Sequence, residues 1–171
     1  MAAGSTYTPI ATQTLASNQT TVTFSSISSA YTDLVLILQV AYPPSWVDTW
    51  LQFNGDTATN YSNTILSGNG TSATSIRAST QAYIALVSTG EASTLGASQI
   101  IVSINNYANA TTNKTILSRA GTAGTASAGF GTDAVVGLWR STAAVTSILL
   151  KPNGGYFATG STLTLYGITA A

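Results

Sequence analysis

The chain has 171 residues, a length that suits one domain with a substantial core, and its five basic and five acidic residues leave a formal net charge of zero. Only 6% of residues are charged, which excludes a basic nucleic-acid-binding protein. The sequence contains no Cys and no His, which excludes disulfides, Ser-His-Asp catalysis and imidazole metal sites. Because net charge keeps soluble proteins apart, this composition favours association with copies or partners; the alternative is a soluble, hydroxyl-coated monomer.

Short sheet-forming runs separated by Gly, Asn, Ser and Pro fill the first half of the chain. The run at 20–24 alternates, with Val22 and Phe24 on one side. The longest apolar run, 33–41, is expected to be a central strand covered on both faces, and it is too short to cross a membrane. The Asn-Gly-Asp triplet at 54–56 is a strong turn signal. Strands are predicted at residues 10–15, 20–24, 33–41, 49–53 and 63–66.

The second half continues in the same style, and Trp139 lies in an alternating run that predicts a core position. The Gly/Ala-rich segment 121–131 is expected to be a loop, either a contact arm or a mobile connection. Together the runs predict an all-β fold, an antiparallel β-sandwich or jelly roll of about ten strands. Residues 1–171 form one domain in this interpretation, with 1–20 as a candidate N-terminal arm leading into the first strand. The further strands are predicted at residues 81–88, 98–105, 114–119, 134–140, 146–151 and 162–168.

No catalytic or metal site is predicted, so the chain is expected to be non-enzymatic and to bind no cofactor. The acidic residues lie at predicted strand starts or in turns, where turn capping explains them better than a pair of carboxylates for glycoside hydrolysis. A Ca²⁺ loop over 54–60 would contain a single carboxylate, and no glycine-rich phosphate loop is followed by Lys and Ser or Thr. The five acidic residues are Asp33, Asp48, Asp56, Glu91 and Asp133.

The most unusual segment is 42–50, with the sequence YPPSWVDTW. Its two prolines stiffen the backbone and keep it out of regular strand pairing. Its aromatic side chains have three open interpretations: a rigid contact with a partner, stacking on sugar rings, or closure of one end of the core. The candidate partner or oligomer interface consists of Tyr42, Pro43, Pro44, Trp46 and Trp50.

Several short motifs follow one another along the chain: YTPIAT at 7–12, VTFSSI at 22–27, YTDLVL at 31–36, FNGD at 53–56, NYS at 60–62, GNG at 68–70 and LTLYGI at 163–168. In this order they resemble a recurrent pattern in small structural proteins of tailed bacteriophages, including cyanophages. The resemblance spans most of the chain, and each motif consists of common strand and turn residues.

The resemblance implies a virion protein with a β-sandwich or jelly-roll body. Its members include capsid decoration (cement) proteins, which would sit on the outer surface of the phage head as homotrimers. Such a trimer would bind the major capsid protein, bridge neighbouring subunits and stabilise the DNA-filled head. The alternative is a tail-fibre or head-fibre module that recognises a host surface glycan or protein, and a third possibility is a secreted adhesin or lectin outside any phage. No nucleic-acid or membrane partner is expected.

Overall fold

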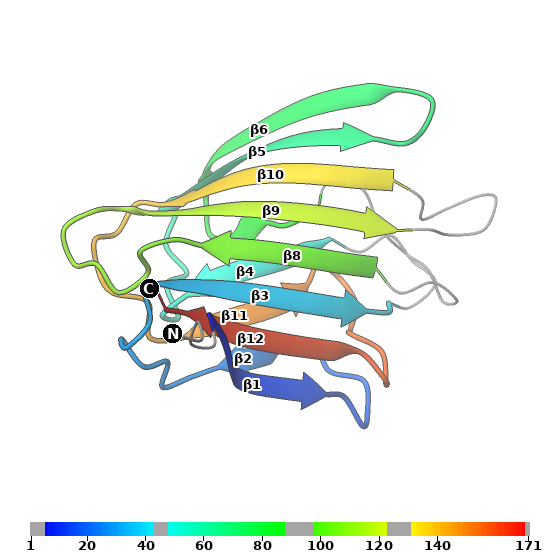
Figure 1. Ribbon diagram of the computed structural model, residues 1–171. Helices are drawn as coiled ribbons and strands as arrows, with labels where there is room; N and C mark the ends of the chain where they lie inside the picture. Colours follow the sequence, from blue (N-terminus) through cyan, green and yellow to red (C-terminus); the bar gives the residue numbers. More distant parts are fainter. Residues whose placement is uncertain (1–5, 43–47, 88–97, 123–130, 170–171) are drawn as a thin grey trace.

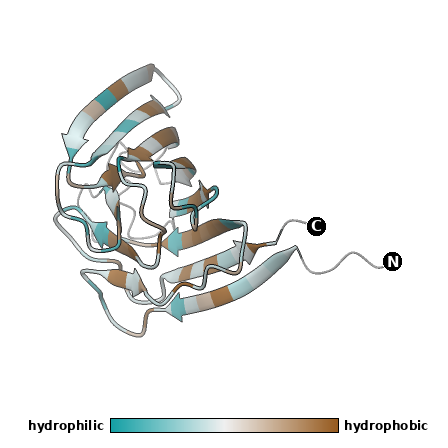
Figure 2. Cartoon of the chain, turned by 90° about the vertical axis from the view of Figure 1, so that its left-hand side faces the viewer, coloured by the Kyte–Doolittle hydropathy of each residue, from teal (hydrophilic) through white to brown (hydrophobic). Residues whose placement is uncertain are grey.

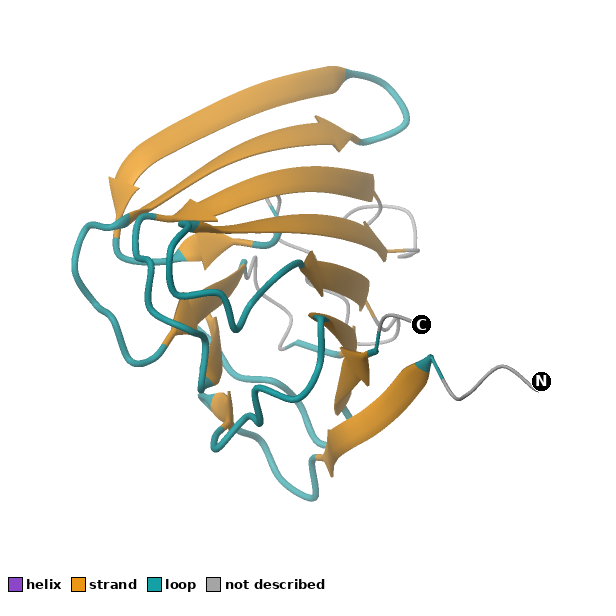
Figure 3. Cartoon of the chain, turned by 60° about the vertical axis from the view of Figure 1, so that its left-hand side comes forward, coloured by secondary structure: helices purple, strands orange, loops and turns teal. Residues whose placement is uncertain are grey.

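The computed structural model describes residues 6–42, 48–87, 98–122 and 131–169. In this part of the chain all regular structure is β-strand, with loops and turns between the strands (Figure 3). Branched and aromatic residues dominate most of these strands because they pack well on a pleated surface. The strands are β1 (Tyr7–Thr14), β2 (Val22–Phe24), β3 (Asp33–Val40), β4 (Thr49–Phe53), β5 (Tyr61–Gly68), β6 (Ala73–Gln81), β7 (Ile84–Ala85), β8 (Ser98–Ile104), β9 (Lys114–Thr122), β10 (Gly131–Trp139), β11 (Ile148–Pro152) and β12 (Thr162–Ile168).

The strands form two antiparallel sheets that pack as a β-sandwich (Figure 1). The large sheet has eight strands in the order β1-β12-β3-β8-β9-β10-β5-β6, and the small sheet has four in the order β2-β11-β4-β7. Strand β1 pairs with β12, so the two ends of the described chain lie in one sheet. The predicted antiparallel β-sandwich is confirmed, and jelly-roll connectivity stays a prediction.

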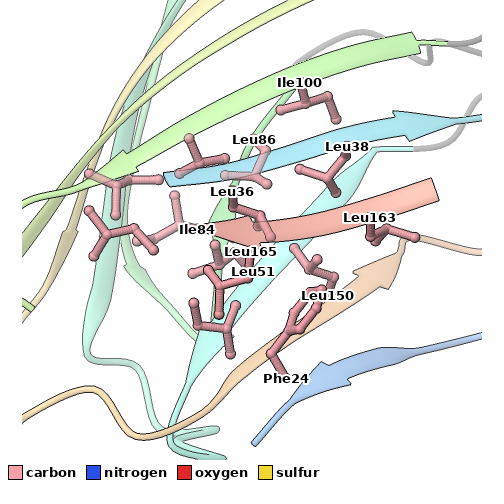
Figure 4. Close-up of a cluster of buried hydrophobic side chains, with 14 of the residues drawn as sticks. Phe24, Leu36, Leu38, Leu51, Ile84, Leu86, Ile100, Leu150, Leu163 and Leu165 are labelled. Atoms are coloured by element: carbon pink, nitrogen blue, oxygen red, sulfur yellow. The ribbon is translucent and has the colours of Figure 1, made fainter. Parts of the chain in front are cut away.

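Alternation of side chains along the strands places the core between the two sheets. On β3, Leu34, Leu36 and Leu38 are fully buried, whereas Val35 and Ile37 on the other side are half-buried. Figure 4 shows leucine and isoleucine side chains from both sheets meeting in this layer. The expectation that the strand at 33–41 is covered on both faces is therefore wrong. Within the described residues the small sheet covers only the inner face of β3, and no second layer lies on the outer face.

The hairpin of β5 and β6 is the largest departure from the predicted strands. The sequence predicts a short strand at 63–66, but β5 and β6 span 8 and 9 residues and pair along most of that length. The sequence does not predict β6 because this edge strand is rich in Ser and Thr and is mostly exposed. Of the predicted strand at 81–88, Gln81 ends β6, Ile84 and Ala85 form β7, and Ser88 lies outside the described residues.

The predicted turn at 54–56 is confirmed, and it also forms hydrogen bonds to the loop at 144–146. Asn54 and Gly55 have φ angles of 53° and 68°, in the left-handed region that Asn-Gly turns favour. The Asn54 side chain accepts the backbone N–H of Thr146 at 2.8 Å and donates to the carbonyl oxygen of Ala144 at 2.8 Å. The turn after β4 therefore fixes the loop that leads into β11.

Two further expectations fall partly outside the described residues. In the predicted loop at 121–131, residues 123–130 are not described, and Gly121 and Gly131 belong to β9 and β10. In the candidate arm at 1–20, residues 1–5 are not described, whereas 7–14 form the edge strand β1. The described residues include no helix of the length and apolarity needed to span a membrane.

Candidate interaction surfaces

Tyr42 begins the aromatic segment that the sequence selects, and the structure places it in the core. Its side chain is 1% exposed, and its ring lies against Phe157 with the centroids 5.9 Å apart. Its hydroxyl hydrogen-bonds to the hydroxyl of Thr49. The expectation of a projecting Tyr42 is corrected, because a side chain enclosed by its own sandwich cannot reach a partner. Three other candidates in this segment lie outside the described residues: Pro43, Pro44 and Trp46.

Trp50 points to the outer side of the small sheet. Strand β4 alternates, and Trp50 and Gln52 are its half-buried residues. The Trp50 ring stacks on the ring of Tyr83, with a centroid separation of 3.7 Å and an interplanar angle of 11°. Gln52 Nε2 donates to the carbonyl oxygen of Ala82 at 2.8 Å. The segment before β7 therefore covers both outward side chains of β4, and one face of the indole ring is used within the molecule.

A carboxylate and an amide lie close to the Trp50–Tyr83 stack. Asp48 accepts the backbone N–H of Asn153 at 2.8 Å through its carbonyl oxygen, and its carboxylate accepts the Asn153 side chain at 3.4 Å. Burial raises the pKa of Asp48; the hydrogen bond from Asn153 opposes this rise and the charge of Asp133 adds to it. Burial and the charge of Asp48 raise the pKa of Tyr83. The stack is thus bordered by a carboxyl group that is held more easily protonated than usual.

An open hollow of about 710 Å³ lies on the same outer face. It is lined by Thr21, Lys151 and Tyr156 among others, and Lys151 is opposite Trp50 in the register of β11 and β4. Aromatic rings beside a few polar groups are typical of small-ligand sites. This combination is the feature of the small sheet that could hold a sugar.

The carboxylates of Asp33 and Asp56 cap turns. Asp56 accepts the backbone N–H of Ala58 at 2.9 Å, Asn60 Nδ2 at 3.0 Å and Trp139 Nε1 at 2.7 Å. Burial alone would raise the pKa of Asp56, but these three hydrogen bonds outweigh it and the pKa is lowered. Asp33 accepts a backbone N–H from the connection between β8 and β9 at 2.6 Å. No group of three metal-ligating side chains occurs in the part of the chain that is described.

Lys114 is a cation of the core rather than of the surface. Its side chain is 1% exposed, and Nζ donates to the carbonyl oxygens of Thr112 at 2.7 Å and Thr142 at 3.2 Å. Burial lowers the pKa of this ammonium group. The two carbonyls lie in different loops, so Lys114 fixes these loops at one end of the sandwich. Its partner Trp139 in β10 is 2% exposed, and the predicted core position of Trp139 is confirmed.

The outer face of the large sheet exposes apolar side chains on neighbouring strands. Leu66 on β5 and Leu117 on β9 are both 57% exposed, and Val136 on β10 is 54% exposed. Leu117 is opposite Val136, and Leu66 is opposite Ala134, so the four form two adjacent cross-strand pairs. Together with Ile101 they line an open hollow of about 430 Å³. We call these five residues the outer apolar patch.

Three of the five cations lie on the same face as this patch. Arg119 is opposite Ala134, and Arg77 lies in the same cross-strand row as Val136, two strands away. Arg140 follows β10 on its outward side and donates to a hydroxyl on β5 at 3.1 Å. All three arginines are exposed. Arg119 lies within the patch and lines its hollow, whereas Arg77 and Arg140 lie beside it. The patch therefore combines apolar side chains with positive charge.

The hairpin of β5 and β6 also exposes apolar area on its inner side. Ile76 on β6 is opposite Ile65 on β5, so both point toward the side of the small sheet. Ile65 is 3% exposed, but Ile76 is 50% exposed. The topmost strand in Figures 1 and 2, β6, accordingly carries apolar segments at the rim of the sandwich. The large sheet is wider than the layer that covers it.

The outer apolar patch is not among the sequence-based predictions, although the sequence contains a pattern that indicates its residues. Consecutive residues of a strand point to opposite faces, so two adjacent apolar residues place one side chain inside and one outside. Such doublets occur at 65–66, 116–117 and 135–136, in three strands that are neighbours in the large sheet. Only the strand order shows that their outward members meet.

Comparison with known proteins finds no relative: no protein-family model, no curated protein and no solved structure matches the chain. The resemblance to tailed-phage structural proteins therefore rests on the sequence motifs. Function is accordingly inferred from the two outer faces.

Proposed function

We propose that this chain is a non-enzymatic structural protein of a tailed-bacteriophage virion, a capsid decoration protein that bridges neighbouring capsid subunits on the outer surface of the head. The observation that carries the proposal is the outer apolar patch on a protein with few charges. Soluble monomers rarely expose large contiguous apolar patches, and such patches mark protein interfaces. The sequence motifs supply the phage context.

The size of the outer face of the large sheet suits a stable protein interface. It is eight strands wide, and β8 at its centre is 7 residues long. With strands about 4.8 Å apart and a rise of about 3.3 Å per residue, the face measures roughly 34 by 23 Å, or about 780 Å². A standard interface buries about 800 Å² on each partner. A partner of ordinary size could thus cover this face.

A decoration protein acts mechanically. Three copies related by a threefold axis would each present the same face to the shell, and several simultaneous contacts raise the overall avidity. A protein that binds the assembled shell more tightly than its separated subunits stabilises the assembled state by mass action. The exposed leucine and valine side chains of this face help here, since burying them desolvates no ions.

Cryo-electron microscopy of the intact particle tests this proposal. The expected result is density for this chain at threefold positions of the head, with the outer face of the large sheet toward the shell. Density confined to the tail or to a few spikes would overturn the decoration role. So would failure of the purified protein to bind DNA-filled or empty shells that lack it.

A second candidate function is recognition of a host surface glycan by a tail or head fibre. The Trp50–Tyr83 stack beside Asp48, Lys151 and an open hollow favours it, because sugar rings bind to aromatic faces bordered by polar groups. Tryptophan fluorescence measured during titration with a panel of glycans is expected to change in the wild type and to lose that change in Trp50→Ala. A panel that leaves both spectra unchanged would contradict this function.

A further inference from the structure

We infer that the outer face of β8, β9, β10, β5 and β6 docks a protein segment that carries apolar side chains flanked by carboxylates. This inference rests on the proposed function, because it names the chemistry of the partner that the face would contact. Three features of that face support it: exposed apolar side chains, exposed arginines and the absence of an outward carboxylate on β9, β10, β5 and β6.

The centre of the face can receive apolar side chains from a partner. Leu117 and Val136 face each other across β9 and β10, and both are more than half exposed. Leu66 and Ala134 form the next pair, and the hollow between these side chains has a volume of about 430 Å³. Burial of a leucine-sized side chain is worth about 1.5–3 kcal/mol. The hydrophobic part of the binding energy would come from this centre.

The charges on the face have one sign. Arg77, Arg119 and Arg140 are exposed on this face, in a chain whose formal net charge is zero. The strands β9, β10, β5 and β6 contain a single carboxylate, Asp133, and it is 3% exposed because it points inward and hydrogen-bonds to Ser67 on β5. The positive charge of this face is therefore a local excess, and a partner with carboxylates would complement it.

The positions of the arginines limit how the partner's carboxylates can be spaced. Arg119 on β9 and Arg77 on β6 are three strands apart, about 14 Å across the sheet. Arg140 already donates to Ser62 Oγ and to the carbonyl oxygens of Thr59 and Tyr61. Arg77 and Arg119 form no ion pair within the described part of the chain, so both guanidinium groups can bind a partner's carboxylates. The strands between them, β10 and β5, carry Val136 and Leu66 on the same face.

Two other occupants fit this face less well. A second copy packed face to face would bring arginines onto a surface that offers them no outward carboxylate on these strands, and like charges in an interface are costly. Nucleic acid requires a continuous basic stripe that replaces counterions, and here exposed leucine and valine side chains separate the arginines.

Binding to purified phage shells that lack this protein tests the inference. The wild type is expected to bind with an affinity that falls as salt rises, because charge pairs contribute. The double variant Arg77→Glu/Arg119→Glu and the single variant Leu117→Ser are each expected to bind at least about 10-fold more weakly, a loss of about 1.4 kcal/mol or more. Thr23→Glu adds a negative charge on the other outer face, where Thr23 of β2 is exposed, and it is expected to leave shell binding unchanged. Thermal melting of each variant checks that it is folded.

A second probe separates this inference from the proposed function. A short peptide with leucines at its centre and a glutamate at each end is added to the isotope-labelled protein, and the same peptide with a lysine at each end serves as the control. The glutamate peptide is expected to shift the amide signals of β9, β10 and β5, and Arg119→Glu is expected to abolish those shifts. Shifts on this face without any binding to shells would overturn the phage function and support the docking face.

Three results would overturn the docking face. Shell binding that the double arginine variant leaves unchanged is the first, and equal responses to the glutamate and lysine peptides are the second. The third is self-association in sedimentation experiments that both Leu117→Ser and the double arginine variant abolish, because the occupant would then be a second copy of this chain.

Discussion

The two outer faces of the sandwich differ in what covers their large side chains. On the small sheet, Trp50 is stacked on Tyr83 at 3.7 Å, and the neighbouring Gln52 is hydrogen-bonded to the same segment. On the large sheet, Leu66 and Leu117 are each 57% exposed. An unusual aromatic residue in the sequence is therefore a weaker indication of a binding face than ordinary aliphatic residues that the fold leaves uncovered.

The difference also concerns charge. The small sheet places Lys151 and Asp48 near its aromatic stack, so both signs of charge occur there. The large sheet carries three exposed arginines on the face of its patch, without an exposed carboxylate on β9, β10, β5 or β6. A face that carries both signs of charge and is partly covered by the protein's own chain suits a small polar ligand. A face with exposed apolar side chains and only positive charge suits a protein partner.

The largest effect on stability is expected from a substitution in the core, because both outer faces depend on the packing between the two sheets. Leu51 on β4 is 0% exposed, and its replacement in Leu51→Ala should lower the free energy of unfolding by about 3 kcal/mol because it leaves a cavity between the sheets. Urea denaturation measures this loss. The control is Val136→Ala on the outer face of the large sheet, which should change the free energy by less than about 0.5 kcal/mol. Equal losses in the two variants would show that Val136 is not exposed.

The comparison of the two faces is tested directly by Trp50→Ala and Leu117→Ser. Trp50→Ala should lower the free energy of unfolding by about 2 kcal/mol, because it removes the stack on Tyr83 and part of a buried surface. Leu117→Ser should change it by less than about 0.5 kcal/mol, since its side chain is already in water.

A double-mutant cycle completes this test. Trp50→Ala and Tyr83→Ala should show a coupling energy of about 0.5–1.5 kcal/mol in chemical denaturation. Additive effects of the two substitutions would mean that the stack does not cover the small sheet as described.

The carboxylates of Asp56 and Asp48 should respond to pH with opposite signs. The pKa of Asp56 is lowered from 3.8, so its stabilising contribution is present above that value and is lost as the pH falls through the folded-state pKa. Asp56→Asn should therefore cost about 1–2 kcal/mol near neutral pH, through its lost hydrogen bonds, and less in acid. Thermal melting between acidic and neutral pH measures both limits.

Asp48→Asn is the matched control for this pH effect. The pKa of Asp48 is raised from 3.8, so its charge lowers stability as the pH rises from that value through the folded-state pKa. Removing the charge should leave the melting temperature at neutral pH the same or higher. A fall in stability near neutral pH, as large as that of Asp56→Asn, would contradict the assigned environments.

Among the substitutions of buried residues, the smallest loss of stability is expected for Tyr42→Phe. The substitution removes the hydrogen bond between Tyr42 and Thr49 but keeps the ring against Phe157, so it should cost about 0.5–1 kcal/mol. Shell binding should not change, because Tyr42 lies in the core. A Tyr42→Phe variant with native stability and weaker shell binding would indicate that Tyr42 contacts the shell.

Alternation and turn residues predict most strands of this fold. The strands at 49–53 and 162–168 match β4 and β12 residue for residue, because a clear turn or loop borders each of them. The edge strand β6 is not predicted because its side chains are mostly exposed, so it needs few apolar residues. In the candidate site the prediction selects Trp50 and Tyr42 because they lie in the proline-stiffened segment 42–50, and this pattern does not reveal whether a ring is stacked, buried or exposed.

The amino-acid sequence by itself determined an all-β chain with alternating strands, and it excluded imidazole and thiol chemistry. The two-residue period of a strand says which side chains share a side, but it does not say which side another layer will cover. The tertiary structure decided that, by placing β5 beside β10, more than sixty residues away along the chain, and by making one sheet twice as wide as the other. The outward members of the apolar doublets and the three arginines meet on one face only because of this strand order, which depends on contacts between residues distant in sequence.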